Sequence, residues 1–214
     1  MKNITKQTEP VSLTTHRCQQ HADYDNYAAK NDLRTTLLAE QGHLCCYCMQ
    51  RIRWGVGEYQ MKIAHWHSQA GYPAEQLKYR NLLAACPGNE GHPLDQQHCD
   101  TRQGARDIAF NPAEPTHDVE LLIRYLGDGT IESDHVDFDD DLNTVLNLNH
   151  PRLKANRRAV VDSVIAELSR NPGGRTRGEI ENMIQAWLDQ NGGRFREYCC
   201  VAVYYLKKRL NRIP

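Results

Sequence analysis

The sequence predicts an α+β protein in which a small zinc-stabilised core of two strands and one helix lies between an N-terminal helix and a C-terminal helical bundle. Cys45 and Cys48 form a Cys-x-x-Cys pair, and Cys86 and Cys99 follow in turn-rich sequence. Short apolar segments of strand length separate the two pairs. After residue 151, apolar residues recur at the three- and four-residue spacing of amphipathic helices. These three observations predict the fold class.

The four cysteines predict a structural metal site. A Cys-x-x-Cys spacing lets two thiolates bind one Zn²⁺ from a single tight turn. The sequence between Cys86 and Cys99 contains two prolines and two glycines, which favour a second turn. The alternative is that the cysteines are buried free thiols, which pack as small hydrophobic groups. We favour one tightly held Zn²⁺ on Cys45, Cys48, Cys86 and Cys99, with a ligand role for Cys46 as the lesser alternative.

A reactive set of side chains lies between the cysteines. Residues 62–66 are predicted to form a short strand ending at His65, residues 81–85 a second strand, and residues 99–110 a helix with Asp100 in its first turn. A divalent ion on Asp100 and a histidine opposite would suit phosphodiester cleavage. A neutral imidazole can take a proton from water, and a hard cation can polarise the phosphate.

These residues carry a resemblance to a known family. The motifs resemble those of the HNH endonuclease superfamily with its ββα-metal fold, and more narrowly the PtuB-type HNH proteins of Septu and retron anti-phage defence systems: Cys45-x-Tyr47-Cys48, Ile63-x-His65-Trp66, Tyr79-x-Asn81-Leu82-Leu83-x-x-Cys86 and His98-Cys99-Asp100-x-x-x-Gly104. The motifs span residues 33–110, and the rest of the chain is similar only in length and general character.

The resemblance implies a role for each motif residue. His65 would be the general base, and Asn81 would brace the loop and the histidine. Asp100 would bind a catalytic Mg²⁺ or Mn²⁺, and the four cysteines would bind structural zinc. The resemblance also implies a complex with a PtuA-type ATPase, joined in retron versions by a reverse transcriptase and its small DNA–RNA product. The chain itself has no Walker A sequence.

Ala64 departs from the family pattern. The residue before the histidine is normally an acidic metal ligand, and a methyl group cannot bind a cation. Mg²⁺ depends on few protein oxygens, so the loss of one carboxylate should weaken its binding sharply. Three interpretations follow: this chain cleaves poorly, a group such as His67 substitutes for the carboxylate, or the chain is an inactivated variant. We favour the third.

Basic side chains near these motifs are candidates for nucleic-acid binding. They alternate with apolar residues after the first cysteine pair, flank Tyr79, or share a face of the predicted helix: Arg51, Arg53, Lys78, Arg80, Arg102 and Arg106. The alternative is that they are ordinary solvated positions. The sequence does not decide between DNA and RNA as the substrate.

Composition indicates a cytoplasmic protein. A hydrophobic content of 40% and a charged content of 25% are ordinary for a globular domain. No apolar run approaches the roughly 18 residues of a membrane span, and the N-terminus lacks the apolar core of a signal peptide. Eight cysteines in such a chain favour a reducing compartment and metal binding over disulfides.

The net charge of −1 hides an uneven distribution. Residues 111–141 contain ten acids and one lysine or arginine, whereas residues 152–214 contain thirteen bases and six acids. The basic tail could meet phosphates, or its charges could simply cover the solvated faces of helices. The acidic run at residues 137–141 is interpreted as a solvated loop.

We therefore divide the chain into four parts. Residues 1–40 contain an extended polar arm and nearly all of the helix predicted over residues 23–41. Residues 41–110 are expected to form the zinc-binding nuclease domain, and residues 111–151 an acidic hairpin and loop region. Residues 152–214 are three helices, broken near 171–174 and 191–193, that are expected to dock a partner.

The leading hypothesis for function is a metal-dependent HNH endonuclease acting as the toxic effector of an anti-phage complex. The alternative is a non-catalytic zinc module that binds nucleic acid or holds an ATPase assembly.

Overall fold

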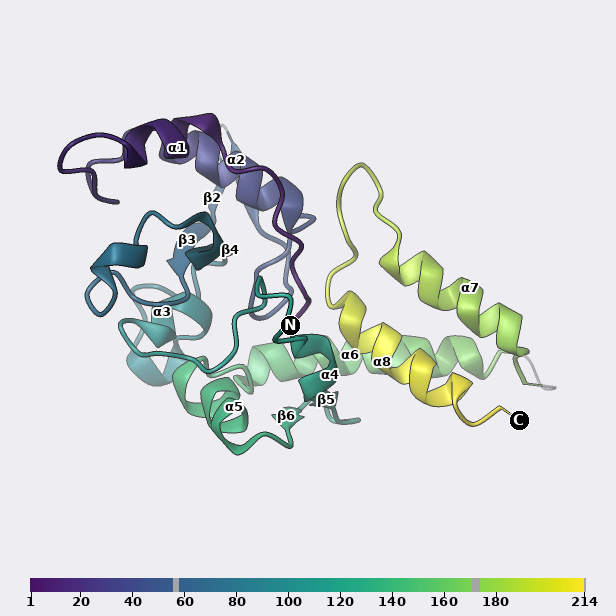
Figure 1. The fold of residues 1–214 in the computed structure, drawn as a ribbon. Coiled ribbons are helices and arrows are strands. Elements are labelled where there is room, and N and C mark those ends of the chain that lie inside the picture. The colour runs from purple at the N-terminus through teal and green to yellow at the C-terminus, as the bar shows by residue number, and fades with distance from the viewer. Residues whose placement is uncertain (56–57, 171–173, 214) are drawn as a thin grey trace.

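The protein has a mixed α+β architecture, seen here in a computed structural model that describes residues 1–55, 58–170 and 174–213 (Figure 1). The N-terminal half is a set of short strands and turns covered by two helices, and the C-terminal third consists of longer helices packed on one another. Within the described residues, none of the helices combines the length and apolar character that crossing a bilayer requires.

The elements up to residue 103 are short. The helices and 3₁₀ turns are α1 (Val11–Arg17), α2 (Lys30–Glu40), η1 (Pro73–Glu75), η2 (Tyr79–Asn81), η3 (Leu94–Gln96) and α3 (Cys99–Gln103). The strands are β1 (Arg53–Gly55), β2 (Glu58–Gln60), β3 (Lys62–His65) and β4 (Leu82–Ala85).

The elements after residue 103 include the long helices. They are α4 (Val119–Leu122), β5 (Ile123–Tyr125), β6 (Ile131–Ser133), α5 (Val136–Asp140), a π-helical turn η4 (Asp141–Val145), α6 (Pro151–Leu168), α7 (Arg177–Leu188) and α8 (Cys199–Leu210). The last three are the three helices that the sequence predicts, and α8 packs against both α6 and α7.

The strands form antiparallel pairs: β1 with β2, β3 with β4, and β5 with β6. In the central pair, Ala64 lies opposite Leu83 and His65 opposite Leu82. All four residues of β4 are buried, and helix α3 packs beside β3. The order β3, β4, α3 agrees with the predicted order of strand, strand and helix.

Several predicted boundaries are wrong for local reasons. The predicted helix over 23–41 begins only at Lys30, because the side chains of Asp23 and Asn26 each accept a hydrogen bond from the other's backbone N–H, which stabilises a turn. The predicted helix over 99–110 ends at Gln103, since Gly104 follows with a φ of +59°. The third C-terminal helix begins at Cys199, after Tyr198 adopts a left-handed conformation.

Two predicted loops contain helices. The arm at residues 1–20 includes α1, whose Leu13 is buried, and the arm is anchored by the buried side chains of Met1 and Ile4. The acidic run at 137–141 belongs to α5 and η4, and Asp141 is buried there, accepting a hydrogen bond from the backbone of Ala109 at 2.7 Å. Residues 56–57, and residues 171–173 of the predicted helix break, lie outside the described residues.

Two hydrophobic clusters hold these elements. The large one joins the N-terminal arm, the cysteine turns, the β3–β4 pair and the first half of α6. The small one lies between the outer parts of α6, α7 and α8 and contains Val164, Ile180, Ala202 and Leu206. The outer end of the helical bundle therefore has a core of its own.

Gln41 connects α2 to the cysteine turn and to β4. Its amide donates to the carbonyls of Leu44 (2.9 Å) and Ala84 (2.8 Å) and accepts from the Ala84 N–H (2.7 Å). The residue is buried. We expect Gln41→Ala to lower the free energy of unfolding by about 3 kcal/mol, because it leaves the buried Leu44 carbonyl and the buried Ala84 N–H without their side-chain partner.

Urea unfolding of the zinc-bound protein measures this effect. The control is Gln19→Ala, at an exposed position, for which we expect a change within about 0.5 kcal/mol. Equal stability of the two variants would contradict the role of Gln41.

Candidate metal centre

Three separate segments bring the four predicted cysteines together. Cys45 and Cys48 lie in a turn closed by backbone hydrogen bonds from Cys45 N–H to the Gln50 carbonyl and from Met49 N–H to the Cys45 carbonyl. Cys86 directly follows β4, and Cys99 begins α3. The turn is attached to β4 by a hydrogen bond from Cys46 N–H to the Ala84 carbonyl at 2.9 Å.

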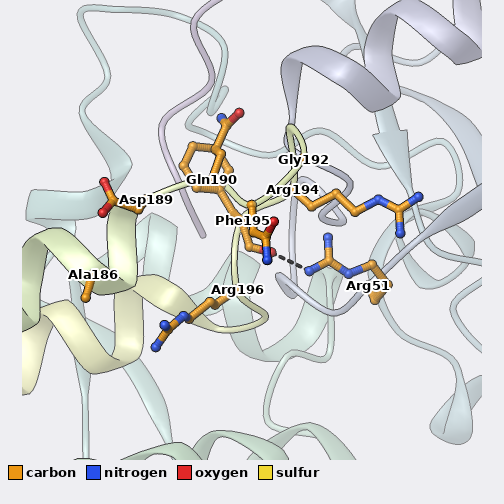
Figure 2. Close-up of a pocket in the computed structure, with 9 residues that line it drawn as sticks. Arg51, Ala186, Asp189, Gln190, Gly192, Arg194, Phe195 and Arg196 are labelled. Carbon is orange, nitrogen blue, oxygen red and sulfur yellow. Dashed lines mark hydrogen bonds between the residues drawn. The ribbon is translucent and has the colours of Figure 1, made fainter.

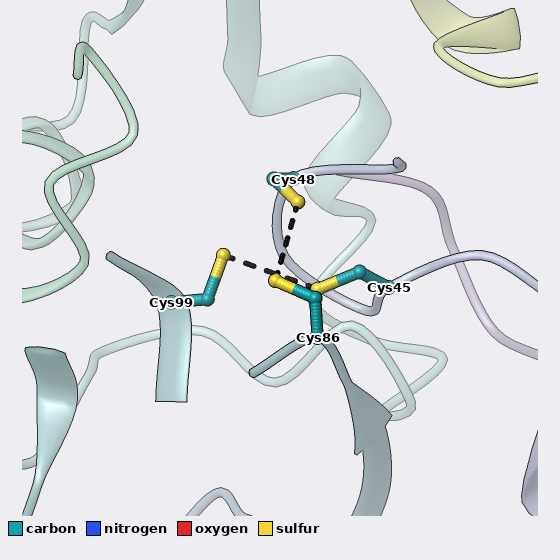
Figure 3. A group of neighbouring side chains, drawn as sticks. All are labelled: Cys45, Cys48, Cys86 and Cys99. Atoms are coloured by element: carbon teal, nitrogen blue, oxygen red, sulfur yellow. Dashed lines mark hydrogen bonds between the residues drawn. The ribbon is translucent and has the colours of Figure 1, made fainter. Parts of the chain in front are cut away.

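The sulfur positions fit a tetrahedral metal ion (Figure 3). All four Sγ atoms lie within 4.8 Å of one another, with 3.9 Å between Cys45 and Cys99 and 3.8 Å between Cys48 and Cys86. Four sulfurs at the Zn–S distance of about 2.3 Å form a tetrahedron with edges of about 3.8 Å. All four residues are buried free cysteines, so they could hold a structural metal such as zinc.

Cys46 lies beside this group without belonging to it. Burial raises the pKa of the Cys46 thiol well above its ordinary value. Burial also opposes ionisation of Cys45, but hydrogen bonds from neighbouring thiols, Cys46 first among them, bring the pKa of Cys45 well below its ordinary value. The geometry therefore favours Cys45 as a thiolate and Cys46 as a neutral thiol that donates to it.

A hydrogen-bonded chain leads from the sulfurs to Arg152, which the sequence did not suggest. His98 is fully buried, and its Nδ1 lies 3.2 Å from Cys99 Sγ. Its Nε2 lies 3.1 Å from Arg152 Nη2, which also donates to Asn89. Burial lowers the pKa of His98 to about 4, so the ring is neutral. Because Arg152 can only donate, Nε2 accepts, and Nδ1–H is then free to donate to Cys99.

We expect Arg152→Gln to release zinc roughly tenfold faster, since groups that support metal ligands typically change metal affinity by about 10- to 100-fold. Transfer of zinc to a chromogenic chelator at neutral pH measures the rate. The control is Arg158→Gln on the same helix, where the exposed guanidinium pairs with Asp162. The same release rate in both variants would exclude a role for Arg152 in holding the metal.

His65 is held at the end of β3. The residue is 8% exposed, its Nε2 lies 3.1 Å from the Gln76 carbonyl, and the ring of Tyr24 meets it edge-on at 4.5 Å. A carbonyl can only accept, so Nε2 carries the proton and Nδ1 keeps its lone pair. Burial lowers the pKa of His65 below its ordinary value of 6.5, so the ring is neutral near pH 7.

We expect a long-range ¹H–¹⁵N correlation spectrum at pH 7 to show His65 as the neutral Nε2–H tautomer, with its signals assigned by their loss in His65→Gln. A folded pKa below the unfolded one stabilises the fold above about pH 6.5, and this contribution is lost as the pH falls through the folded pKa. An Nδ1–H tautomer, or a charged ring at pH 7, would contradict the geometry.

The side chain of Asn81 holds the segment after His65. Its Oδ1 accepts from the His67 N–H at 2.7 Å, and its Nδ2 donates to the carbonyls of His67 (3.0 Å) and Glu75 (3.1 Å). The residue is buried at the end of η2. Asn81 therefore fixes the path of residues 67–75, and all its described contacts are with backbone atoms.

The Asp100 carboxylate approaches β3 at Lys62. Alternate residues of a strand face opposite sides, so Lys62 and Ala64 share the face toward α3. The Lys62 ammonium lies 3.8 Å from the Asp100 carboxylate, and Ala64 is fully buried. Burial raises the pKa of Asp100 to about 6 although Lys62 lowers it. The same ammonium also pairs with Glu90 at 3.0 Å, so two carboxylates share Lys62. An ammonium and a methyl group beside Asp100 are a poor fit for a hard divalent ion.

The predicted convergence of His65 and Asp100 is not seen as a contact. Over residues 1–55, 58–170 and 174–213, no hydrogen bond or ion pair joins the two side chains. The ring of Tyr24 contacts His65. Burial raises the pKa of the Tyr24 phenol to about 12, and the negative charge of Asp100 adds to this effect. Tyr24 lies in the segment between α1 and α2, whose packing over β3 the sequence did not indicate.

His67, the suggested substitute for the missing carboxylate, is engaged elsewhere. Its ring is stacked between Trp66 (3.7 Å between ring centroids) and Tyr72 (4.0 Å), and its Nδ1 lies 2.8 Å from Glu75 Oε2. The structure pairs His67 with Glu75 rather than with Asp100.

The six basic candidates lie on several elements. Arg53 is exposed on β1. Arg51 donates to the carbonyls of Gly42, His43 and Phe195, and Arg102 to that of Leu94. Arg106 donates to the carbonyls of Gln103 and Val145, Lys78 pairs with Glu75, and Arg80 pairs with Glu114. The ion pairs of Lys78 and Arg80 are exposed, and such pairs contribute little to stability.

Comparison with known proteins leaves the family open. No family model matches the chain, and no curated protein is significantly similar to it.

Proposed function

We propose that the chain is a zinc-stabilised, metal-dependent nuclease of the HNH type, acting in an anti-phage complex with an ATPase partner. The observation that carries the proposal is the neutral imidazole of His65, which is held at the end of β3 with its Nδ1 unprotonated. The β3–β4 pair and α3, which lie beside it, meet at the four cysteines. A general base with its lone pair fixed in position is what hydrolysis of a phosphodiester needs.

The roles of the residues follow from their contacts. His65 Nδ1 accepts a proton from the attacking water, while the Gln76 carbonyl holds the opposite ring nitrogen and orients the ring. Asn81 keeps the following segment in place through its bonds to the backbone of His67 and Glu75. Asp100 would be the residue to hold a divalent ion, and such an ion would supply positive charge for the phosphate.

The present side chains hold such an ion weakly, because Ala64 contributes no oxygen and Lys62 competes for the Asp100 carboxylate. The test is therefore cleavage of DNA and of RNA by Ala64→Glu with Mg²⁺ or Mn²⁺, and loss of that cleavage in Ala64→Glu/His65→Ala. The proposal fails if Ala64→Glu leaves both nucleic acids intact, alone and together with an ATPase partner.

A second candidate function is a non-catalytic zinc module that binds nucleic acid or holds an ATPase assembly. The ammonium of Lys62, 3.8 Å from Asp100 on the face that Ala64 shares, favours it, because it supplies positive charge where a metal would otherwise be needed. If this function holds, His65→Ala should leave the defence phenotype unchanged in cells.

A further inference from the structure

A basic pocket lies between the first cysteine turn and the loop that joins α7 to α8 (Figure 2). Its volume is about 680 Å³, and its lining includes Arg51, Arg194, Arg196, Asp189 and Phe195. Three of these side chains are guanidinium groups and one is a carboxylate. This volume is within the range of ordinary ligand sites, which hold molecules much larger than a single ion.

Arg51 gives the pocket a rigid positive wall. Its guanidinium donates to the carbonyls of Gly42 (3.1 Å), His43 (3.3 Å) and Phe195, and the last of these bonds is drawn in Figure 2. Its backbone N–H donates to Glu197. Since Arg51 is bonded to carbonyls on both sides of the pocket, its charge stays in place whether or not a ligand is present.

Arg194 adds a second charge that the protein does not neutralise. Its side chain makes no ion pair or hydrogen bond within the residues that the structure describes. Burial is the largest cause that lowers the pKa of the Arg51 guanidinium; the Glu197 carboxylate raises this pKa, and the nearby charge of Arg194 lowers it. Both arginines also lower the pKa of His43, although burial is the largest cause. The potential on this side of the pocket is therefore positive.

The other side of the pocket has an arginine on an aromatic ring. The Arg196 guanidinium lies 5.2 Å from the centre of the Trp187 ring, and no acid pairs with it in the described part of the chain. Asp189, the acid of the lining, accepts a hydrogen bond from Gln185 at 2.8 Å. In Figure 2 the side chain of Arg196 lies across Phe195 from those of Arg51 and Arg194.

We propose that this pocket binds phosphate groups of a polynucleotide backbone. Two guanidinium groups without an ion-pair partner among the described residues, beside one bonded to backbone carbonyls, offer planar pairs of donors that match phosphate oxygens. Arginines distributed over an open pocket of this size suit successive phosphates better than one isolated anion. The site is separate from His65 and does not depend on the proposed nuclease function.

The experiment measures binding of a fluorescein-labelled 12-nucleotide single strand to the zinc-bound chain by fluorescence anisotropy, without added Mg²⁺ or Mn²⁺, over a range of salt concentrations. We expect Arg194→Gln to weaken binding roughly tenfold, because it removes a charged donor. The slope of log affinity against log salt should fall by about 0.7, the value for one phosphate contact on a single strand. Arg194→Lys, which keeps the charge, should recover most of the slope.

The matched control is Arg177→Gln, which removes one exposed arginine from α7 outside the pocket. Equal affinity and slope for Arg194→Gln and Arg177→Gln would overturn the proposal.

Two further probes identify the ligand. Competition by the unlabelled strand, but not by millimolar inorganic phosphate, supports a site for the polynucleotide backbone. Equal competition by inorganic phosphate, or tighter binding of a labelled poly-glutamate peptide that Arg194→Gln abolishes, would overturn it.

Discussion

Cys86→Ser is expected to lose bound zinc and the cooperative unfolding transition of the N-terminal half. Cys86 is buried in the group of four sulfurs and directly follows β4, so its loss breaks the link between the β3–β4 pair and the cysteine turn. Zinc binding at a structural site contributes an apparent folding free energy of about 10–16 kcal/mol, whereas the free energy of unfolding of a whole domain is only about 5–15 kcal/mol. Losing most of the metal contribution should therefore leave this half unfolded at 37 °C.

Zinc per chain, measured by elemental analysis after dialysis, and thermal unfolding followed by circular dichroism check the result. The parent should contain one zinc per chain. Cys18→Ser, at the exposed cysteine, should match the parent in both measurements. Cys46→Ser is the sharper control, because Cys46 is equally buried but lies outside the group of four, and it should keep the metal. A Cys86→Ser protein with full zinc content would refute the site.

Ala64→Glu is expected to create divalent-metal binding and to raise cleavage of nucleic acid by about 100-fold or more. Residue 64 shares a face of β3 with Lys62, which approaches Asp100, so a carboxylate there can join Asp100 around one ion. Single groups that stabilise transition-state charge are typically worth about 100- to 1,000-fold in rate. The added carboxylate also gives Lys62, which already pairs with Glu90 at 3.0 Å, a further acid to pair with, which reduces its competition for Asp100.

Packing sets a cost for this substitution. Ala64 is fully buried, and adding a larger side chain to a packed position costs about 1–3 kcal/mol. Ala64→Asp is the smaller version with the same charge, and Ala64→Gln matches the size of glutamate without the charge. Isothermal titration with Mn²⁺ and cleavage of labelled DNA and RNA should separate them: the two acidic variants gain binding and cleavage, and Ala64→Gln gains neither. Equal activity of Ala64→Gln and Ala64→Glu would show that the carboxylate is not a metal ligand.

Patterns between near neighbours in the chain predicted much of the fold. The Cys-x-x-Cys turn and the apolar spacing after residue 151 each depend on residues a few positions apart, and each has its counterpart in the structure. Where these predictions failed, the competing signal was also local. The Asp23–Asn26 turn delays α2, and Gly104 ends α3 early, because short-range hydrogen bonds and backbone preferences outweigh helix propensity there.

The sequence by itself thus determined the group of four cysteines, the order of strands and helix around it, and the three C-terminal helices. Only the tertiary structure decided which partners surround the reactive groups: the Gln76 carbonyl on His65, Lys62 beside Asp100, and the Phe195 carbonyl on Arg51. The physical reason is that burial and hydrogen bonding act on whatever the fold brings within a few ångströms. Arg51 and Phe195 are 144 residues apart in the chain, and no local pattern encodes their meeting.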